Sequence, residues 1–466
     1  MPSIVSVGVI RTTGRLAAFL TAAILLAACA AASQSALPVG SAARAEAFAQ
    51  SPGASGINRI DHVIIIVQEN RGFDNLFQGA PNADTQSWGY DSKGEKINLR
   101  PLTMKTTWDL EHSFQAFLTS CNGTGKFPGT DCRMNGFDQE GVECGGSGEP
   151  RCPIRNPMYS YVPRSESKPY FDMASQYVLA DRMFVSNIDE SSFVSHQYII
   201  AGQASSSMNV PENGPWGCSG SAVVSTLTQQ RTQGGLIPAC FDNQTLGDEL
   251  DAAKVSWKYY TASLGHGDGG LWSAYQAIDH IYNGPDWKKD VVNPQTRFFK
   301  DVRNGRLPAV SWVTPTCKNS DHAGCDADDG PKWVSALVNA VGESKYWKTS
   351  AIFVFWDDPG GWYDHVAPKK LDYDGLGFRV PLLVISPYAK RGRVSHLSYE
   401  HGSLLRFVED RFGLATLSAS DARATSPAAD CFNFLEAPRK FVKIQTTMSA
   451  RDFEREPLDP RPVDTE

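Results

Sequence analysis

Acidic side chains closely follow two apolar runs of the sequence. Glu69 comes after the run at residues 63–67, and Asp357 and Asp358 come after the run at residues 351–356. Continuous β-branched and aromatic runs of this kind predict strands that are covered on both faces. Ligands of open α/β sheets bind beyond the carboxyl ends of the strands, so we expect the two acidic motifs to converge there.

Three carboxylates at one edge of a sheet would repel one another. A pair about 4 Å apart costs on the order of a few kcal/mol at an effective dielectric constant of about 20. A bound cation would remove this cost, and oxygen donors favour a hard divalent ion such as Ca²⁺, Mg²⁺ or Mn²⁺. The alternative is that these acids are solvated at loop starts or cap a helix. Because both motifs follow apolar runs, the sequence favours a metal site.

Further apolar runs indicate the elements that would position these acids. Residues 381–386 predict a third covered strand, and shorter candidates lie at 255–261 and 309–313. Apolar residues recur at helical spacing in 332–341 and in 403–412. Strands separated by helical stretches predict an α/β fold with a mostly parallel central sheet flanked by helices.

Three ordered motifs resemble those of the bacterial phosphoesterase family. They are Glu-Asn-Arg-Gly-Phe-Asp at 69–74, Trp-Asp-Asp-Pro-Gly-Gly-Trp-Tyr-Asp-His at 356–365, and Gly-Phe-Arg-Val-Pro at 377–381. The family includes phospholipases C that do not use zinc and AcpA-like acid phosphatases. The resemblance spans residues 57–435 and implies an alkaline-phosphatase-like fold that hydrolyses phosphoric esters.

The resemblance also implies a nucleophile that binds the metal. The family uses a Ser or Thr, and the matching segment here is residues 189–198, in which spacing favours Ser192 over Ser191. Ser192 would attack phosphorus and form a phosphoseryl intermediate, since a bound cation lowers the pKa of a hydroxyl. A helix-like run follows at 198–204. The implied metal ligands are Glu69, Asn70, Ser192, Asp357 and Asp358.

Histidines complete the predicted site. His112 and His322 lie in segments that resemble those holding pocket histidines in the family, and each would bind phosphate oxygens or protonate the leaving alkoxide. His266, in a Gly-rich loop, is a weaker candidate for substrate binding. His365 lies inside the second motif and is expected to orient its loop.

The sequence departs from the family pattern at three places. Gly72 replaces the usual Ser of the first motif, and Asp358 stands where many phospholipases have Glu. The segment 195–198 lacks the Thr-x-Pro-Asn-Arg form of the phospholipase branch. These departures favour the phosphatase-like branch, so a phosphomonoester and a phospholipid both remain candidate substrates.

Residues 1–29 are typical of a lipoprotein signal peptide. The apolar stretch at 16–28 is shorter than the roughly 20 residues that a membrane-spanning helix needs. Leu-Ala-Ala-Cys, ending at Cys29, resembles a bacterial lipobox, in which the Cys is lipidated. The alternative is ordinary cleavage near residues 30–32. Both predict export, as a cell-envelope lipoprotein or a secreted protein, and a lipidated Cys29 would contact the membrane.

The rest of the chain divides by composition. Residues 30–56 are rich in Ala, Ser, Gly and Pro and predict a flexible linker. Residues 57–440 form the predicted catalytic domain. Residues 441–466 form the C-terminal tail, which is expected to be loose from 445 onward.

Export would allow disulfides. Eight of the nine cysteines after Cys29 form close sequential pairs, and Cys431 is left over. The expected bridges would pin loop insertions such as 121–152 onto the core. A cysteine-based zinc site is the weaker alternative, because the CxxC spacing of such sites is absent. The predicted pairs are Cys121–Cys132, Cys144–Cys152, Cys218–Cys240 and Cys317–Cys325.

Charge and composition narrow the function. The chain has 44 Lys and Arg against 51 Asp and Glu, a net charge of −7, which gives no broad basic surface for nucleic acid. The sequence therefore favours an exported, metal-dependent phosphoric-ester hydrolase. The alternative is a non-catalytic cell-surface binding lipoprotein on the same fold.

Overall fold

The computed structural model describes residues 56–142, 154–263, 270 and 272–459 of the 466-residue chain. The predicted signal peptide, nearly all of the predicted linker, the Cys144–Cys152 pair and His266 lie outside the described residues. None of the helices in the described ranges is long and apolar enough to cross a bilayer.

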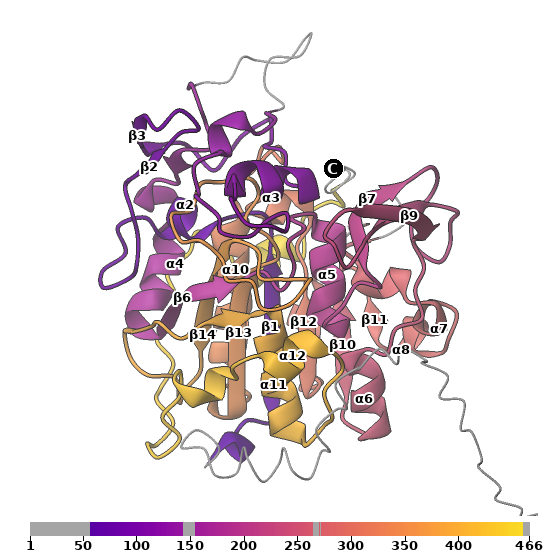
Figure 1. Ribbon diagram of the computed structural model, residues 1–466. Coiled ribbons are helices and arrows are strands. Elements are labelled where there is room, and N and C mark those ends of the chain that lie inside the picture. The colour runs from indigo at the N-terminus through magenta and orange to yellow at the C-terminus, as the bar shows by residue number, and fades with distance from the viewer. Residues whose placement is uncertain (1–55, 143–153, 264–269, 271, 460–466) are drawn as a thin grey trace, which may run out of the picture. The chain divides into compact units, whose positions relative to one another are not determined.

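A nine-stranded sheet forms the centre of the domain (Figure 1). β14 runs antiparallel to both of its neighbours, β13 and β6, and the other strand pairs of this sheet are parallel. In spatial order the strands are β11 (Val291–Val292), β10 (Trp257–Tyr260), β12 (Val310–Val313), β1 (His62–Gln68), β13 (Ser350–Trp356), β14 (Arg379–Ile385), β6 (Val178–Phe184) and β15 (Arg393–Ser395), with β16 (Tyr399–Glu400) also paired to β6.

The five strands predicted from apolar runs are all present, and the sequence reasoning missed β6. Every residue of β13 and β14 is buried, as expected of strands covered on both faces. β6 escaped notice because Asp181 and Arg182 interrupt its apolar pattern. Asp181 is nevertheless buried, because its carboxylate accepts hydrogen bonds from the Asp84 amide and from His396.

Helices pack in two groups against the sheet. α10 contacts α4 and α9, whereas α11 contacts α5 and α12. Figure 1 shows α5, α11 and α12 in front of the strands. The helices are α2 (Phe73–Phe77), α3 (Phe114–Cys121), α4 (Arg164–Gln176), α5 (Ser192–Ala201), α6 (Leu246–Ala252), α7 (Asp279–Tyr282), α8 (Asp286–Lys289), α9 (Arg297–Arg303), α10 (Gly330–Gly342), α11 (His401–Phe412), α12 (Ala419–Arg423) and α13 (Ala450–Phe453).

Two of these helices match the predicted stretches, and α5 corrects one. The runs at 332–341 and 403–412 lie in α10 and α11. The helix-like run expected at 198–204 belongs to α5, which begins at Ser192 and ends before Gly202. Every residue of α5 is buried, so it lacks the one-sided apolar spacing that marks a surface helix.

Loop insertions carry the short sheets and the disulfides. The predicted bridges Cys121–Cys132, Cys218–Cys240 and Cys317–Cys325 are present, and buried Cys431 is in no disulfide. The expected α/β fold with disulfide-pinned insertions is thus confirmed. The short strands are β2 (Trp88–Tyr90) with β3 (Lys96–Asn98), β4 (Arg100–Pro101) with β5 (Ser160–Tyr161), and β7 (Ser207–Glu212), β8 (Val223–Leu227) and β9 (Gln233–Pro238) in one sheet.

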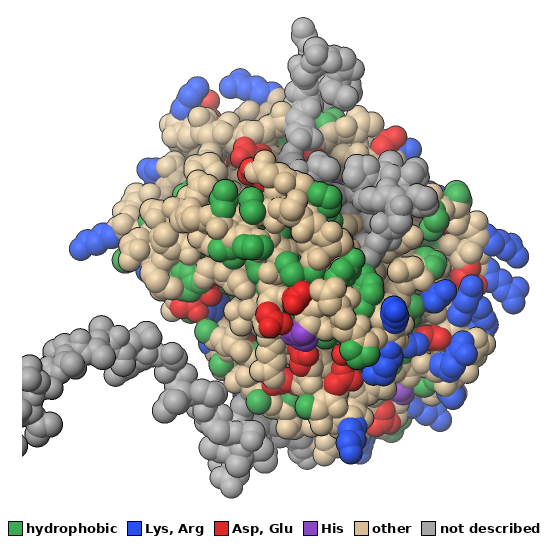
Figure 2. All heavy atoms as spheres, turned by 90° about the vertical axis from the view of Figure 1, so that its right-hand side faces the viewer, with side chains coloured by type: hydrophobic (Ala, Val, Ile, Leu, Met, Phe, Trp, Pro, Cys, Tyr) green, Lys and Arg blue, Asp and Glu red, His purple; other side chains and the backbone are tan. Residues whose placement is uncertain are grey.

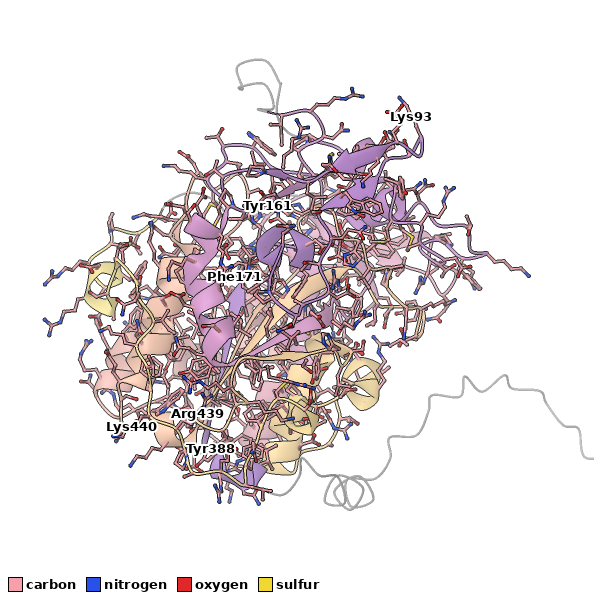
Figure 3. All side chains as sticks on the ribbon, turned by 90° about the vertical axis from the view of Figure 1, so that its left-hand side faces the viewer. Lys93, Tyr161, Phe171, Tyr388, Arg439 and Lys440 are labelled. Carbon is pink, nitrogen blue, oxygen red and sulfur yellow. A yellow bond between two sulfur atoms is a disulfide. The ribbon has the colours of Figure 1, made fainter. Side chains whose placement is uncertain are left out.

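The C-terminal segment packs on the domain, which corrects the expectation of a loose tail for residues 445–459. Figure 3 shows Arg439 beside Tyr388, and the Arg439 amide donates to the Pro387 carbonyl at 3.0 Å. Further along, Phe453 is buried with its ring 5.1 Å from that of Trp333. Glu454 and Glu456 add ion pairs with Arg303 and Lys318, so charged residues of this segment hold it to the domain together with Phe453.

Candidate active site

The parallel register of β1 and β13 brings the two acidic motifs together. Gln68 pairs with Trp356 at the ends of these strands, so Glu69 and Asp357 leave the sheet side by side. The Asp357 amide donates to the Gln68 carbonyl at 3.0 Å, which continues the ladder. The Asn70 amide donates to Asp357 Oδ1 at 3.1 Å. The predicted convergence is therefore observed.

Two unusual backbone positions shape this junction. Asn70 has a φ of 58°, a left-handed conformation that Asn tolerates better than most residues. Gly360 has a φ of 62°, and a Cβ there would collide with the Asn70 carbonyl. The Gly360 amide donates to Asp358 Oδ1 at 2.8 Å. The glycine thus lets the second motif fold back over the first and holds Asp358 in place.

Helix α5 presents Ser192 to the same cluster. Ser191 is the N-cap residue, and Ser192 is the first residue of the helix. The Ser192 Oγ lies 3.1 Å from Asp358 Oδ2 and 3.4 Å from Asn70 Oδ1. The Ser191 hydroxyl makes no well-aligned hydrogen bond to the described residues and interacts with Asp189 instead of the cluster. Of the two candidates, the structure brings Ser192 to the acids.

His196 joins the cluster, and the sequence reasoning missed it. Its Nε2 lies 3.3 Å from Glu69 Oε2 and 3.5 Å from Asp357 Oδ2, with all three side chains fully buried. Residues four apart on a helix share a face, so Ser192 and His196 point to the same side of α5. The spacing of Ser192 and His196 could have revealed this residue. The sequence analysis did not use it because it predicted the helix from residue 198 rather than from Ser192.

The donor set fits a divalent cation. The five predicted ligands are all buried, and one ligand atom from each of Glu69, His196 and Asp357 lies within 4.8 Å of the others. Oδ2 of Asp357 makes no well-aligned hydrogen bond to the described residues. Burial raises the pKa of Asp357, but its contacts with His196 and Glu69 outweigh burial and hold the pKa below the usual range. An ionised, incompletely satisfied carboxylate is what a cation needs.

His112 lies behind Asn70. Its Nε2 is 2.8 Å from the Asn70 side-chain nitrogen, and its Nδ1 is 2.7 Å from the Leu110 carbonyl. The side-chain nitrogen of Asn70 can only donate, so His112 Nε2 accepts and His112 Nδ1 carries the proton. This arrangement turns the Asn70 oxygen toward Ser192. Both His112 nitrogens are thus engaged by protein groups.

His322 differs from His112 because one of its nitrogens remains available. Nδ1 lies 3.3 Å from Asp109 Oδ2 and also contacts the Ala323 carbonyl. Nε2 is buried and makes no hydrogen bond within the described ranges. The His322 ring centroid is 5.7 Å from that of His112. The two predicted histidines therefore lie together, and His322 alone has an oriented, unengaged nitrogen.

A second buried carboxylate cluster lies at the ends of the same strands. Arg379 donates to Asp364 from Nε at 2.9 Å and lies 3.6 Å from Asp74. His365 contacts Asp74 at 2.5 Å and Asp84 at 3.1 Å. This geometry agrees with the expectation that His365 orients its loop.

Curated proteins similar to this chain are phospholipases C. Phospholipase C B of Mycobacterium tuberculosis is 31% identical over 231 residues, covering 41% of this chain and 43% of that protein. Phospholipase C A of the same organism is 25% identical over 451 residues, covering 84% and 81%. Non-specific phospholipase C1 of Arabidopsis thaliana is 25% identical over 444 residues, covering 84% and 75%. The chain thus spans less than half of the first of these relatives.

Solved structures with a similar arrangement include a protein in the alkaline phosphatase superfamily from Vibrio parahaemolyticus. It matches with a TM-score of 0.34 and 10% identity, over 77% of this chain and 68% of that one.

The sequence profile of the Phosphoesterase family matches residues 60–415, which contain Glu69, Ser192 and both acids of the second motif. This match covers most of the chain and all of the central sheet. The protein belongs to the Phosphoesterase family.

Proposed function

We propose that this protein is an exported, metal-dependent hydrolase of phosphoric esters that uses Ser192 as its nucleophile. The observation that carries the proposal is the position of the Ser192 Oγ, 3.1 Å from Asp358 Oδ2 in a buried, carboxylate-rich cluster. Glu69, Asn70, Ser192, Asp357 and Asp358 would hold the cation. When bound, the cation would lower the pKa of the hydroxyl and offset the charge of the phosphoester.

The chain's own groups prepare Ser192 for attack. Asp358 Oδ2 accepts the Oγ–H hydrogen bond, and Asn70 Oδ1 lies 3.4 Å from the same Oγ. Ser192 is also the first residue of α5, where unpaired backbone N–H groups favour anionic oxygens. His112 accepts a hydrogen bond from the Asn70 side chain and so orients it, and we assign His112 a positioning role. The buried setting strengthens each of these interactions.

His322 is the better candidate for the general acid. Asp109 lies against Nδ1, which leaves Nε2 to face a leaving group, as in other aspartate–histidine pairs. Attack by Ser192 Oγ would form the new P–O bond while its proton passes to Asp358 Oδ2 and the P–O bond to the alcohol breaks. The departing alkoxide would take the proton from His322. Water would then cleave the bond to Ser192 and return a proton to its Oγ, which releases phosphate from a phosphomonoester substrate and the phosphorylated head group from a phospholipid.

The nitrogen of His196 changes the expected metal preference. Oxygen donors alone suit Ca²⁺, Mg²⁺ or Mn²⁺, whereas an imidazole beside Glu69 and Asp357 shifts the preference toward transition metals such as Mn²⁺, Fe²⁺ or Zn²⁺. Mn²⁺ is the ion that both donor sets accommodate. We therefore propose Mn²⁺ as the first ion to test.

Two substrate classes and the location complete the proposal. The named relatives support a phospholipid substrate, whereas the departures at Gly72 and Asp358 support a phosphomonoester. The lipobox-like sequence supports export and attachment to the membrane through Cys29. Attachment would keep the enzyme beside lipid, but it would not exclude soluble esters.

The decisive experiment compares Ser192→Ala with Ser191→Ala. p-Nitrophenyl phosphate, p-nitrophenylphosphorylcholine and phosphatidylcholine serve as substrates, each with Mn²⁺ and with chelator. We expect Ser192→Ala to lower kcat by at least about 10³-fold, whereas Ser191→Ala changes it little. An acid quench should trap phosphate on the peptide that contains Ser192. If both variants keep near-normal turnover, a water molecule is the nucleophile. If the wild-type protein hydrolyses none of the three esters, the binding-protein alternative is favoured.

A further inference from the structure

A basic cavity lies at the edge of the sheet formed by β11. The cavity has a volume of about 420 Å³, within the range of small-molecule sites, roughly 300–1,000 Å³. Six cationic side chains line it: Lys258, Lys288, Lys289, Arg297, Lys300 and Arg306. Figure 2 looks onto this side of the domain, and Lys and Arg side chains gather on the right-hand part of the view. This concentration is unexpected in a chain of net charge −7.

Carboxylates balance some of these cations. Asp301 lies 2.5 Å from Lys258 and 3.4 Å from Arg306. Lys289 contacts Asp290 at 2.9 Å and also lies near Asp251 and Asp286. These carboxylates therefore offset the charges of Lys258, Lys289 and Arg306. The Tyr260 hydroxyl donates to Asp301 at 2.9 Å and fixes that carboxylate further.

The other three cations have no such partner. Lys288, Arg297 and Lys300 form no ion pair and no side-chain hydrogen bond among residues 56–142, 154–263, 270 and 272–459, and all three are exposed. Arg297 and Lys300 lie one turn apart on α9, and Lys288 approaches from α8. Three unbalanced charges around one concave surface create a positive potential that only an anion would offset.

We propose that this cavity binds multiply charged phosphate groups, independently of the catalytic cluster. Arg297 offers a planar fork that matches phosphate oxygens, and Lys288 and Lys300 supply point charges beside it. The buried Val291 and the half-buried Val292 also line the cavity. A free polyphosphate and the head group of an anionic lipid share this chemistry.

The test uses a triple variant and a matched control. Lys288→Gln/Arg297→Gln/Lys300→Gln removes the three unbalanced charges. Lys93→Gln/Lys126→Gln/Arg391→Gln removes two Lys and one Arg that are exposed elsewhere and likewise form no ion pair within the described part of the chain. Binding of pyrophosphate is measured by calorimetry with chelator present. Without a cation, the acidic cluster repels the anion, so binding reports the cavity.

We expect the cavity variant to lose pyrophosphate affinity by at least about tenfold, since three charges that attract the anion are removed together. Binding to the wild-type protein should weaken with added salt. If pyrophosphate does not bind, co-sedimentation with vesicles that contain phosphatidic acid, whose phosphomonoester can carry more than one charge, is compared with phosphatidylcholine vesicles to test the lipid source. Loss of that binding in the cavity variant alone would support the proposal with a lipid head group as ligand.

Equal binding by the cavity and control variants in both arms, or no binding by the wild-type protein, would overturn the proposal. Hydrolysis of p-nitrophenyl phosphate by the cavity variant should stay within about twofold of wild type, because none of its residues belongs to the catalytic cluster. Ser192→Ala should bind pyrophosphate normally. Failure of this site and failure of the proposed activity are therefore separate results. If the triple variant does not fold, Lys300→Gln alone should still weaken binding measurably.

Discussion

Two buried carboxylate clusters lie at the ends of the central strands, and they are balanced differently. Asp74 and Asp364 face Arg379, which is fully buried and bonded to both oxygens of Asp364. Asp357 faces His196, which also lies against Glu69. An arginine always carries its charge, whereas a histidine offers either a proton or a lone pair.

This difference suggests a structural role for the cluster around Arg379 and a catalytic role for the cluster around His196. Burial raises the pKa of Asp74, as does Asp364, and the contacts with His365 and Arg379 oppose this. Burial lowers the pKa of Arg379, but the two carboxylates outweigh burial and raise it. That cluster therefore contains its own permanent cation, Arg379. In the Asp357 cluster, one imidazole faces several acids, which leaves room for a divalent cation.

The largest expected effect is on the catalytic cluster. Asp357→Asn should lower kcat/KM by about 10³-fold or more and should lower the Mn²⁺ bound per molecule, because a ligand oxygen and a charge are lost together. Metal analysis and the p-nitrophenyl phosphate assay measure both quantities. Asp321→Asn, a buried carboxylate outside the cluster, is the control. Full activity of a metal-free Asp357→Asn protein would contradict the assignment.

The structural cluster should respond with stability instead. Arg379→Met leaves two buried carboxylates without their cation and should lower the free energy of unfolding by about 3–5 kcal/mol. Arg182→Met breaks a half-exposed contact with Asp84 and should cost about 1 kcal/mol or less. Denaturant unfolding measures both. A loss of bound Mn²⁺ in folded Arg379→Met would show that the two clusters are not separate.

Substitution of His196 tests whether this histidine belongs to the metal site. His196→Asn should weaken Mn²⁺ binding by about 10–100-fold, the usual range for a lost partner of a metal site. Ser195→Ala changes the neighbouring buried residue of α5 and should leave the affinity unchanged. Calorimetric titration with Mn²⁺ gives the comparison. Equal affinities would mean that His196 only packs beside the acids.

The smallest effect concerns pH. Burial raises the pKa of Asp321 from 3.8 to about 6, against the opposing hydrogen bond from Tyr170, the charge of Arg71 and the hydrogen bond from Trp356. The folded protein therefore binds this proton more tightly than the unfolded chain, so the free energy of unfolding falls as pH rises from about 4 to about 6. Asp321→Asn should remove that fall.

Asp321→Asn should therefore be more stable than wild type at pH 7, by on the order of 1–2 kcal/mol, and about equal at pH 4. Its single side-chain oxygen can accept both hydrogen bonds that Oδ2 accepts now, so packing is preserved. Unfolding in denaturant at the two pH values measures the difference. A variant that is less stable than wild type at both would refute this pKa assignment.

The sequence by itself determined five strands of the central sheet, the two acidic motifs and the disulfide pairs that the structure describes. β-branched and aromatic runs such as 351–356 favour covered strands, and acids placed directly after such strands lie at the sheet edge. Cysteines that are close in sequence, such as Cys121 and Cys132, can form a disulfide by closing only a short loop. These features depend on neighbours along the chain, which is why pattern alone revealed them.

Only the tertiary structure decided how the charges are balanced. His196 reaches Glu69 because α5, far away in sequence, packs against the ends of β1 and β13. Arg379 balances the charge of Asp74, although the two residues are about 300 positions apart in the sequence. Local sequence does not show that Asp74 has an arginine partner and Asp357 a histidine partner. β6 and the docked Phe453 were hidden for the same reason, since burial depends on distant partners rather than on local composition.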